Sequence, residues 1–206
     1  AMPETFGRVL SYLCGLLSMP LPPCHARQSP DQPTALWNPI APRLLVDEGL
    51  LHSTDPLVLA THLARRVPYF WAGRAFGVAL SSKQLRNVLM GAMKVVAPRL
   101  KVDDPTGSIG RIHERLQGAP PELRQRLGEV IQSLTKERSS LNITRWMRGL
   151  SHSADRLALV VVADLDLVLQ SHPRAAKADV ANGLREYWLS EEHLTLRQTL
   201  ATSIAV

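Results

Sequence analysis

Cysteine is scarce in this chain of 206 residues, and the scarcity excludes two kinds of small scaffold. The two cysteines, Cys14 and Cys24, are too few and too loosely spaced for a disulfide framework or a zinc site. Cys14 falls in an apolar helical run, so we expect it to be a core residue. The chain also lacks a glycine-rich phosphate loop and a Gly-x-Ser-x-Gly element. None of its seven histidines stands four residues from another, which is the spacing by which one helix holds zinc.

An apolar run as long as a membrane helix is also missing. The unbroken apolar run at residues 157–163 is far shorter than the ~20 residues that a bilayer requires, and Asp164 and Asp166 follow it. The helix that we expect near the N-terminus lacks the basic opening and the small-residue cleavage site of a signal peptide. We therefore expect a cytoplasmic protein without a membrane span.

The composition is that of a folded protein with a real core. Hydrophobic residues make up 45% of the chain and charged residues 20%, which argues against extensive disorder. The length fits a single domain, residues 1–206. We expect it to be a mainly helical α+β domain with three successive parts. These are residues 3–98, with an N-terminal helix, a small sheet and the motif helices; residues 99–171, with basic helices and a central helix; and residues 172–206, with closing helices.

Residues 143–170 are the most apolar part of the chain. Because apolar residues recur there every three or four positions, the pattern predicts one long helix with a buried stripe. From Leu157 onward the opposite face is apolar too, so this half should be covered on all sides. Asn142 can cap its start, and His172-Pro173 should end it. The alternative is a buried strand at residues 159–162, since valine triplets favour strands.

The other elements follow from periodicity and from proline. The proline-broken segment 24–47 predicts a small sheet of three strands: Cys24–Gln28, Thr34–Trp37 and Arg43–Val46. Predicted helices are Glu4–Leu17, a helix capped by Thr54 or Ser53 that runs to about Val67, Tyr69–Leu80, Ser82 to Pro98, Ile109–Leu116, one opening at Pro120, Arg174–Leu189 and Glu191–Ala201. The helix that opens at Pro120 should bury Leu123, Leu127, Val130, Ile131 and Leu134.

Charge is concentrated in the middle of the chain. The whole sequence has a net charge of +6, but residues 61–150 hold sixteen Lys/Arg and only six Asp/Glu. Such a region suits nucleic acid, an acidic partner or a membrane surface. Four arginines, Arg111, Arg115, Arg124 and Arg126, form a candidate binding patch, here called the arginine group. The simpler interpretation is that these arginines decorate exposed helix faces and bind nothing.

The order of several short motifs resembles the M48 family of zinc metallopeptidases. That family has an Asn-Ala-Phe-like stretch, a strand ending in Thr-Glu-Gly-Leu-Leu, a His-Glu-x-x-His helix and a later Glu-x-x-Ala-Asp-Arg helix. The corresponding stretches here are Trp37–Ile40, Arg43–Leu51, Asp55–Arg65 and Ser151–Leu159. The same layout is similar to the C-terminal domain of large tetratricopeptide-repeat proteins from myxobacteria and their relatives. The resemblance covers about residues 5–170, and its strength lies in the shared order of the motifs.

The resemblance also implies that the metal chemistry is lost. Thr61 stands at the first ligand position, His62 at the general base, Arg65 at the second ligand and Ser151 at the glutamate ligand. Arg65 places a fixed positive charge where a dication would sit, which opposes metal binding. Asp155 is the one family position retained next to the ligands. We therefore expect no bound metal and no cofactor.

These observations and the resemblance lead to a non-catalytic pseudo-peptidase domain of zincin-like architecture, which binds a protein partner or regulates a larger, repeat-containing protein. One alternative is an enzyme that uses His62 and His152 in a rearranged site. Another is a nucleic-acid-binding domain that uses residues 61–150. If the scaffold is kept, Arg65 should pair with Asp155 across two helices. Otherwise Asp155 pairs on its own helix or with solvent, and Arg65 points outward.

Overall fold

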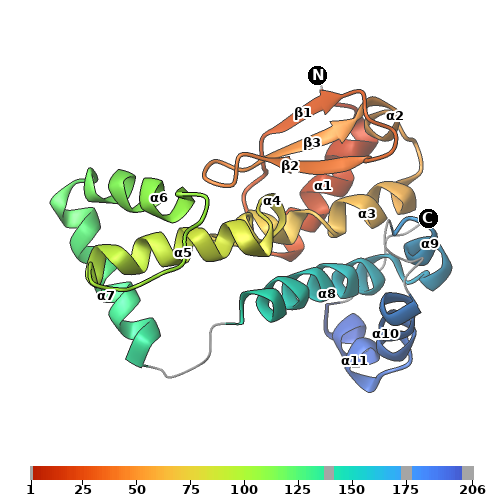
Figure 1. The fold of residues 1–206 in the computed structure, drawn as a ribbon. Helices are drawn as coiled ribbons and strands as arrows, with labels where there is room; N and C mark the ends of the chain where they lie inside the picture. The colour runs from red at the N-terminus through yellow and green to blue at the C-terminus, as the bar shows by residue number, and fades with distance from the viewer. Residues whose placement is uncertain (1, 137–141, 173–177, 201–206) are drawn as a thin grey trace. The chain divides into compact units, whose positions relative to one another are not determined.

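The computed structural model describes residues 2–136, 142–172 and 178–200, and it is mainly helical with a three-stranded sheet near the N-terminus (Figure 1). This confirms the predicted fold class. The chain divides into two compact units. Unit 1 comprises residues 1–79 and 148–206, and unit 2 comprises residues 80–147. These boundaries differ from the three expected parts, because unit 1 is built from both ends of the chain.

The sheet of unit 1 consists of β1 (Cys24–Arg27), β2 (Thr34–Trp37) and β3 (Arg43–Asp47) in the order β1-β3-β2. β1 runs parallel to the central strand β3, and β2 runs antiparallel to it. Leu44 and Val46 of β3 are fully buried, and both point to the same face because side chains alternate along a strand. All three predicted strands are confirmed, to within one residue at each end.

Two of the helices in unit 1 pack against each other and contribute much of the core. α1 (Glu4–Leu16) contacts α3 (Pro56–Ala64), and a single turn, α2 (Glu48–Leu51), follows β3. Buried side chains recur along α1 at helical spacing, and Cys14 is among them, as predicted. The expected cap of α3 was wrong. Asp55 caps the helix, since its carboxylate accepts hydrogen bonds from the backbone N–H groups of Leu57 and Val58 at 2.8 and 3.2 Å.

The predicted helix at residues 69–80 is interrupted. A 3-10 turn, η1 (Val67–Phe70), is separated from α4 (Phe76–Ala79) by a turn in which Gly73 has φ of +78°. That left-handed conformation suits glycine and ends helical geometry.

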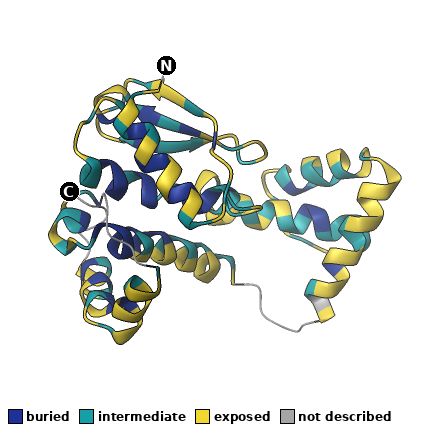
Figure 2. Ribbon diagram, turned by 180° about the vertical axis from the view of Figure 1, so that it is seen from behind, coloured by how far each residue is buried: buried dark blue, intermediate teal, exposed yellow. Residues whose placement is uncertain are grey.

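The predicted long helix at residues 143–170 is in fact two helices, α8 (Ile143–Val162) and α9 (Leu165–Gln170). Ala163 adopts φ of +55°, and the Asp164 side chain then accepts a hydrogen bond from the N–H of Leu167 at 2.9 Å, which starts α9. The N-terminal cap by Asn142 is confirmed, with 2.9 Å to the N–H of Arg145. Residues 158–162 are helical and all buried, so the strand alternative is wrong and the expected covering is confirmed (Figure 2).

Two helices near the C-terminus complete unit 1. α10 (Ala178–Trp188) contacts both α9 and α11 (Glu191–Leu200). The expected bounds of these closing helices at Arg174 and Ala201 lie outside the described residues. No helix in the described parts of the chain is both long enough and apolar enough to cross a membrane.

Unit 2 contains α5 (Ser82–Val96), α6 (Ser108–Gln117) and α7 (Pro121–Lys136). Ser81 and Gln84 form a reciprocal capping box at the start of α5. α5 and α6 approach closely at Gly91, where an added Cβ would lie 2.6 Å from the Cγ2 atom of Ile112. The predicted burial of α7 was partly wrong: Ile131 is buried, whereas Leu123 and Val130 are exposed.

Candidate functional site

Helix α3 positions three of the motif residues. Thr61 is fully buried, and its hydroxyl donates a hydrogen bond to the carbonyl oxygen of Leu57 at 2.7 Å, one turn earlier in the helix. His62 is half-buried on the next position, and Arg65 is the C-terminal cap of the helix. The Thr61 proton is therefore engaged by its own helix.

Arg65 reaches from α3 to two other elements. Its Nε donates a hydrogen bond to Oδ1 of Asp155 in α8 at 3.0 Å, and its Nη1 donates to the carbonyl oxygen of Ser171 at 3.1 Å. The Arg65 and Asp155 side chains are only 11% and 7% exposed. The predicted pair between the two motif helices is thus confirmed. Because Ser171 directly follows α9, one guanidinium group connects α3, α8 and the end of α9.

Asp155 has a second partner that the sequence did not suggest. Its Oδ2 lies 2.9 Å from Nε2 of the buried His172. Burial alone would raise the pKa of Asp155, but the contacts with His172 and Arg65 outweigh it and hold that pKa below its ordinary value. Asp155 is therefore a carboxylate at neutral pH. We call Arg65, Asp155 and His172 the buried triad.

His62 carries no charge at neutral pH. Burial, followed by the positive charges of Arg65 and Arg66, lowers its pKa to about 4. His152, the other histidine of the rearranged-enzyme alternative, is exposed on α8. Ser151 is half-buried and lies one helical turn before Asp155, so these two residues share a face of α8. Within the described residues, no group of three or more His, Cys, Asp or Glu side chains could hold a metal ion.

The chemistry of these positions favours a structural link over catalysis. A glutamate or histidine ligand offers a lone pair to a metal, whereas the Arg65 guanidinium offers only donors and a permanent positive charge. The Asp155 carboxylate, which could accept a proton or ligate a metal, is already bound on both oxygens. What the arrangement does is hold three segments of unit 1 together through buried charge.

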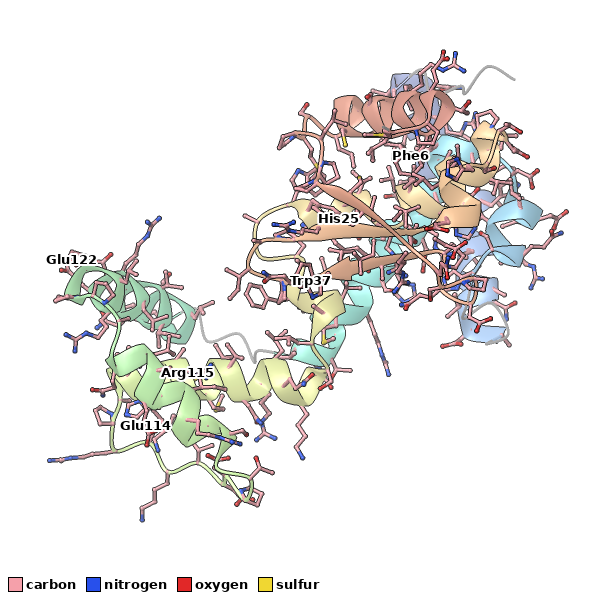
Figure 3. The ribbon with its side chains drawn as sticks, turned by 90° about the horizontal axis from the view of Figure 1, so that it is seen from above. Phe6, His25, Trp37, Glu114, Arg115 and Glu122 are labelled. Atoms are coloured by element: carbon pink, nitrogen blue, oxygen red, sulfur yellow. The ribbon has the colours of Figure 1, made fainter. Side chains whose placement is uncertain are left out.

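The arginine group lies in unit 2. Arg111 and Arg115 are exposed on one face of α6, being four residues apart, while Arg124 and Arg126 are exposed on α7. Residues at positions i and i+2 of a helix point in nearly opposite directions, so Arg124 and Arg126 cannot both face the same partner surface. Figure 3 labels Arg115 beside Glu114, and Glu122 at the start of α7, so acidic side chains are interspersed.

Comparison with known proteins adds no further constraint. No protein-family model, no curated protein and no solved structure matches the chain. The resemblance to the M48 family therefore stays a prediction that depends on the motif order.

Proposed function

We propose that this chain is a non-catalytic domain built on an M48-like scaffold, in which the buried triad occupies the place of a metal centre. Its role is to bind a protein partner or to regulate a larger protein of which it is a module. The observation that carries the proposal is the 3.0 Å contact between Arg65 and Asp155, because the motif alignment required these two residues to meet. They stand 90 positions apart in the chain, and the motif alignment was the sole basis on which their contact was predicted.

The charges at the aligned positions give the proposal a second line of support. A permanently charged guanidinium repels a dication at close range, most strongly where both are shielded from water. His62, at the position of the general base, has a pKa of about 4, so it is neutral and too weakly basic to take a proton from water efficiently near neutral pH.

The scaffold can be tested by restoring the ligands. The substitutions Thr61→His, His62→Glu, Arg65→His and Ser151→Glu together reproduce the ligand set of the family. A matched control carries the same three changes on α3 with Ser153→Glu in place of Ser151→Glu. Ser153 is exposed and lies roughly 200° around α8 from Ser151.

We expect calorimetry to find one tight zinc site in the restored variant, and a clearly weaker one in the control. Zinc should also raise the melting temperature of the restored variant, because a ligand that binds the folded state stabilises it. Equal zinc affinity in both variants, or none in either although both fold, would mean that Ser151 does not face the α3 positions. The scaffold assignment would then be wrong.

A second candidate function is nucleic-acid binding by unit 2, and one observation favours it. Residues 80–147 hold twelve Lys/Arg and six Asp/Glu, so this unit carries the entire net charge of +6, and the rest of the chain is balanced. If the arginine group is functional, changing all four arginines to Glu should abolish binding to mixed DNA, and binding by the unmodified chain should weaken steeply with salt. Equal binding by both proteins would exclude this use of the arginine group.

A further inference from the structure

The connection between β2 and β3 forms an exposed apolar tip. It begins at Trp37, which is 58% exposed, and passes through Ile40, which is 84% exposed. Between Trp37 and Arg43 the chain holds no charged residue and two prolines. Figure 1 shows this connection extending beyond the ends of the strands. A group of exposed apolar side chains on one short connection is a candidate contact surface.

The backbone of the tip is arranged for an apolar environment. The Asn38 side-chain oxygen accepts hydrogen bonds from the N–H groups of Ile40 and Ala41, at 3.1 and 3.4 Å. Pro39 and Pro42 have no N–H group. Every backbone donor from residue 39 to 42 is therefore satisfied or absent, which lowers the cost of taking this turn out of water. Asn38 itself adopts φ of +57°, a left-handed conformation that asparagine tolerates.

The base of the tip is basic and aromatic. The Arg43 guanidinium carbon lies 5.8 Å from the centre of the Trp37 ring, and Arg43 Nη1 donates to His25 Nε2 on β1 at 3.0 Å. Both His25 and Trp37 are labelled in Figure 3. The three strands and α4, which contacts β2, contain one acidic residue, Asp47. It ends β3, roughly 13 Å along the strand from Arg43 at the usual rise per residue.

We propose that the tip at residues 37–43 is an anchor that inserts Ile40 into the interfacial layer of an anionic lipid bilayer. The three levels of the tip match the levels of that interface. Ile40 reaches the acyl boundary, the Trp37 ring lies among the headgroups where tryptophan is enriched, and Arg43 meets lipid phosphates. This anchor is independent of the proposed pseudo-peptidase role.

The experiment uses the full chain and vesicles of two compositions, phosphatidylcholine alone and phosphatidylcholine with about 30% phosphatidylserine. Ile40→Asp is compared with Leu189→Asp, a matched control because Leu189 is 81% exposed and the charge change is the same. We expect the wild-type chain and Leu189→Asp to sediment with the anionic vesicles alike. Ile40→Asp should bind at least about tenfold more weakly, since an acid replaces the inserted apolar side chain. Both sites are exposed, so the melting curves should be unchanged.

A second measurement separates insertion from attraction by charge. Ile40→Cys and Leu189→Cys variants are labelled with a fluorophore whose emission shifts to the blue in apolar surroundings. The wild-type chain is labelled in the same way, and its signal gives the contribution of Cys14 and Cys24. Anionic vesicles should shift the emission of the label at position 40 and leave that at position 189 unchanged. Absence of vesicle binding by the wild-type chain, equal binding by Ile40→Asp, or an unshifted label at position 40 would each overturn the proposal. Absence of vesicle binding is the result expected if the tip instead inserts into a pocket of a partner protein.

Discussion

The contact between Arg65 and Asp155 predicts a large energetic coupling between two residues far apart in sequence. Arg65→Met and Asp155→Leu remove the charges with side chains of similar length. Asp155→Leu leaves the Arg65 guanidinium buried without its carboxylate, and such a loss typically costs about 3–5 kcal/mol of unfolding free energy. Arg65→Met should cost less, about 1–3 kcal/mol, because Asp155 keeps its contact with His172.

The double variant should be less destabilised than the sum of the two single variants, since neither buried charge of the pair remains. We expect a coupling energy of about 1.5–3 kcal/mol from chemical denaturation. The matched control is the exposed pair of Arg8 and Glu4, whose charged atoms lie 4.0 Å apart within α1. Arg8→Met and Glu4→Leu should couple by less than ~0.5 kcal/mol. Additive effects at Arg65 and Asp155 would refute the claim that a buried ion pair connects α3 to α8.

Two further predictions concern α3. The folded-state pKa of His62 is about 4, below its unfolded value, so the unfolded chain takes up a proton first as pH falls. The unfolding free energy should therefore decrease between about pH 6.5 and pH 4. His62→Gln should flatten this part of the plot of unfolding free energy against pH. A slope unchanged by His62→Gln would show that other groups cause it. Asp55→Ala should destabilise the chain by about 1 kcal/mol, because it removes the cap of α3, whereas Thr54→Ala should have little effect. Equal melting temperatures of the two variants would contradict the assignment of the cap.

The sequence predicted the fold well where local signals were strong. Prolines and short β-branched or aromatic segments located all three strands, and apolar periodicity located α1 and α5. The prediction from sequence failed at residue 163, because the apolar pattern continues through the break between α8 and α9. The break consists of the left-handed Ala163 and the Asp164 cap, and apolar periodicity reports neither a backbone dihedral angle nor a capping side chain.

The α7 helix shows a related limit. Its apolar stripe is real, but a stripe does not say which part of it a neighbouring helix will cover, and Leu123 and Val130 are exposed.

The candidate site was predictable in part. Motif order predicted that Arg65 and Asp155 would meet, and the two side chains are in contact. His172 and the Ser171 carbonyl were missed. The sequence His172-Pro173 signalled only the end of a helix, and a backbone carbonyl carries no side-chain signal at all. Partners that enter a site from a segment between elements have no periodic pattern from which to predict them.

The zinc content of the unmodified chain tests the central claim most directly. The protein is equilibrated with zinc, dialysed against metal-free buffer and measured by elemental analysis against its concentration. With Arg65 bound to Asp155 where the resembling family places its metal, the account predicts no stoichiometric zinc. About one zinc per chain retained after dialysis would contradict it, because a tight site of that kind requires at least three protein ligands.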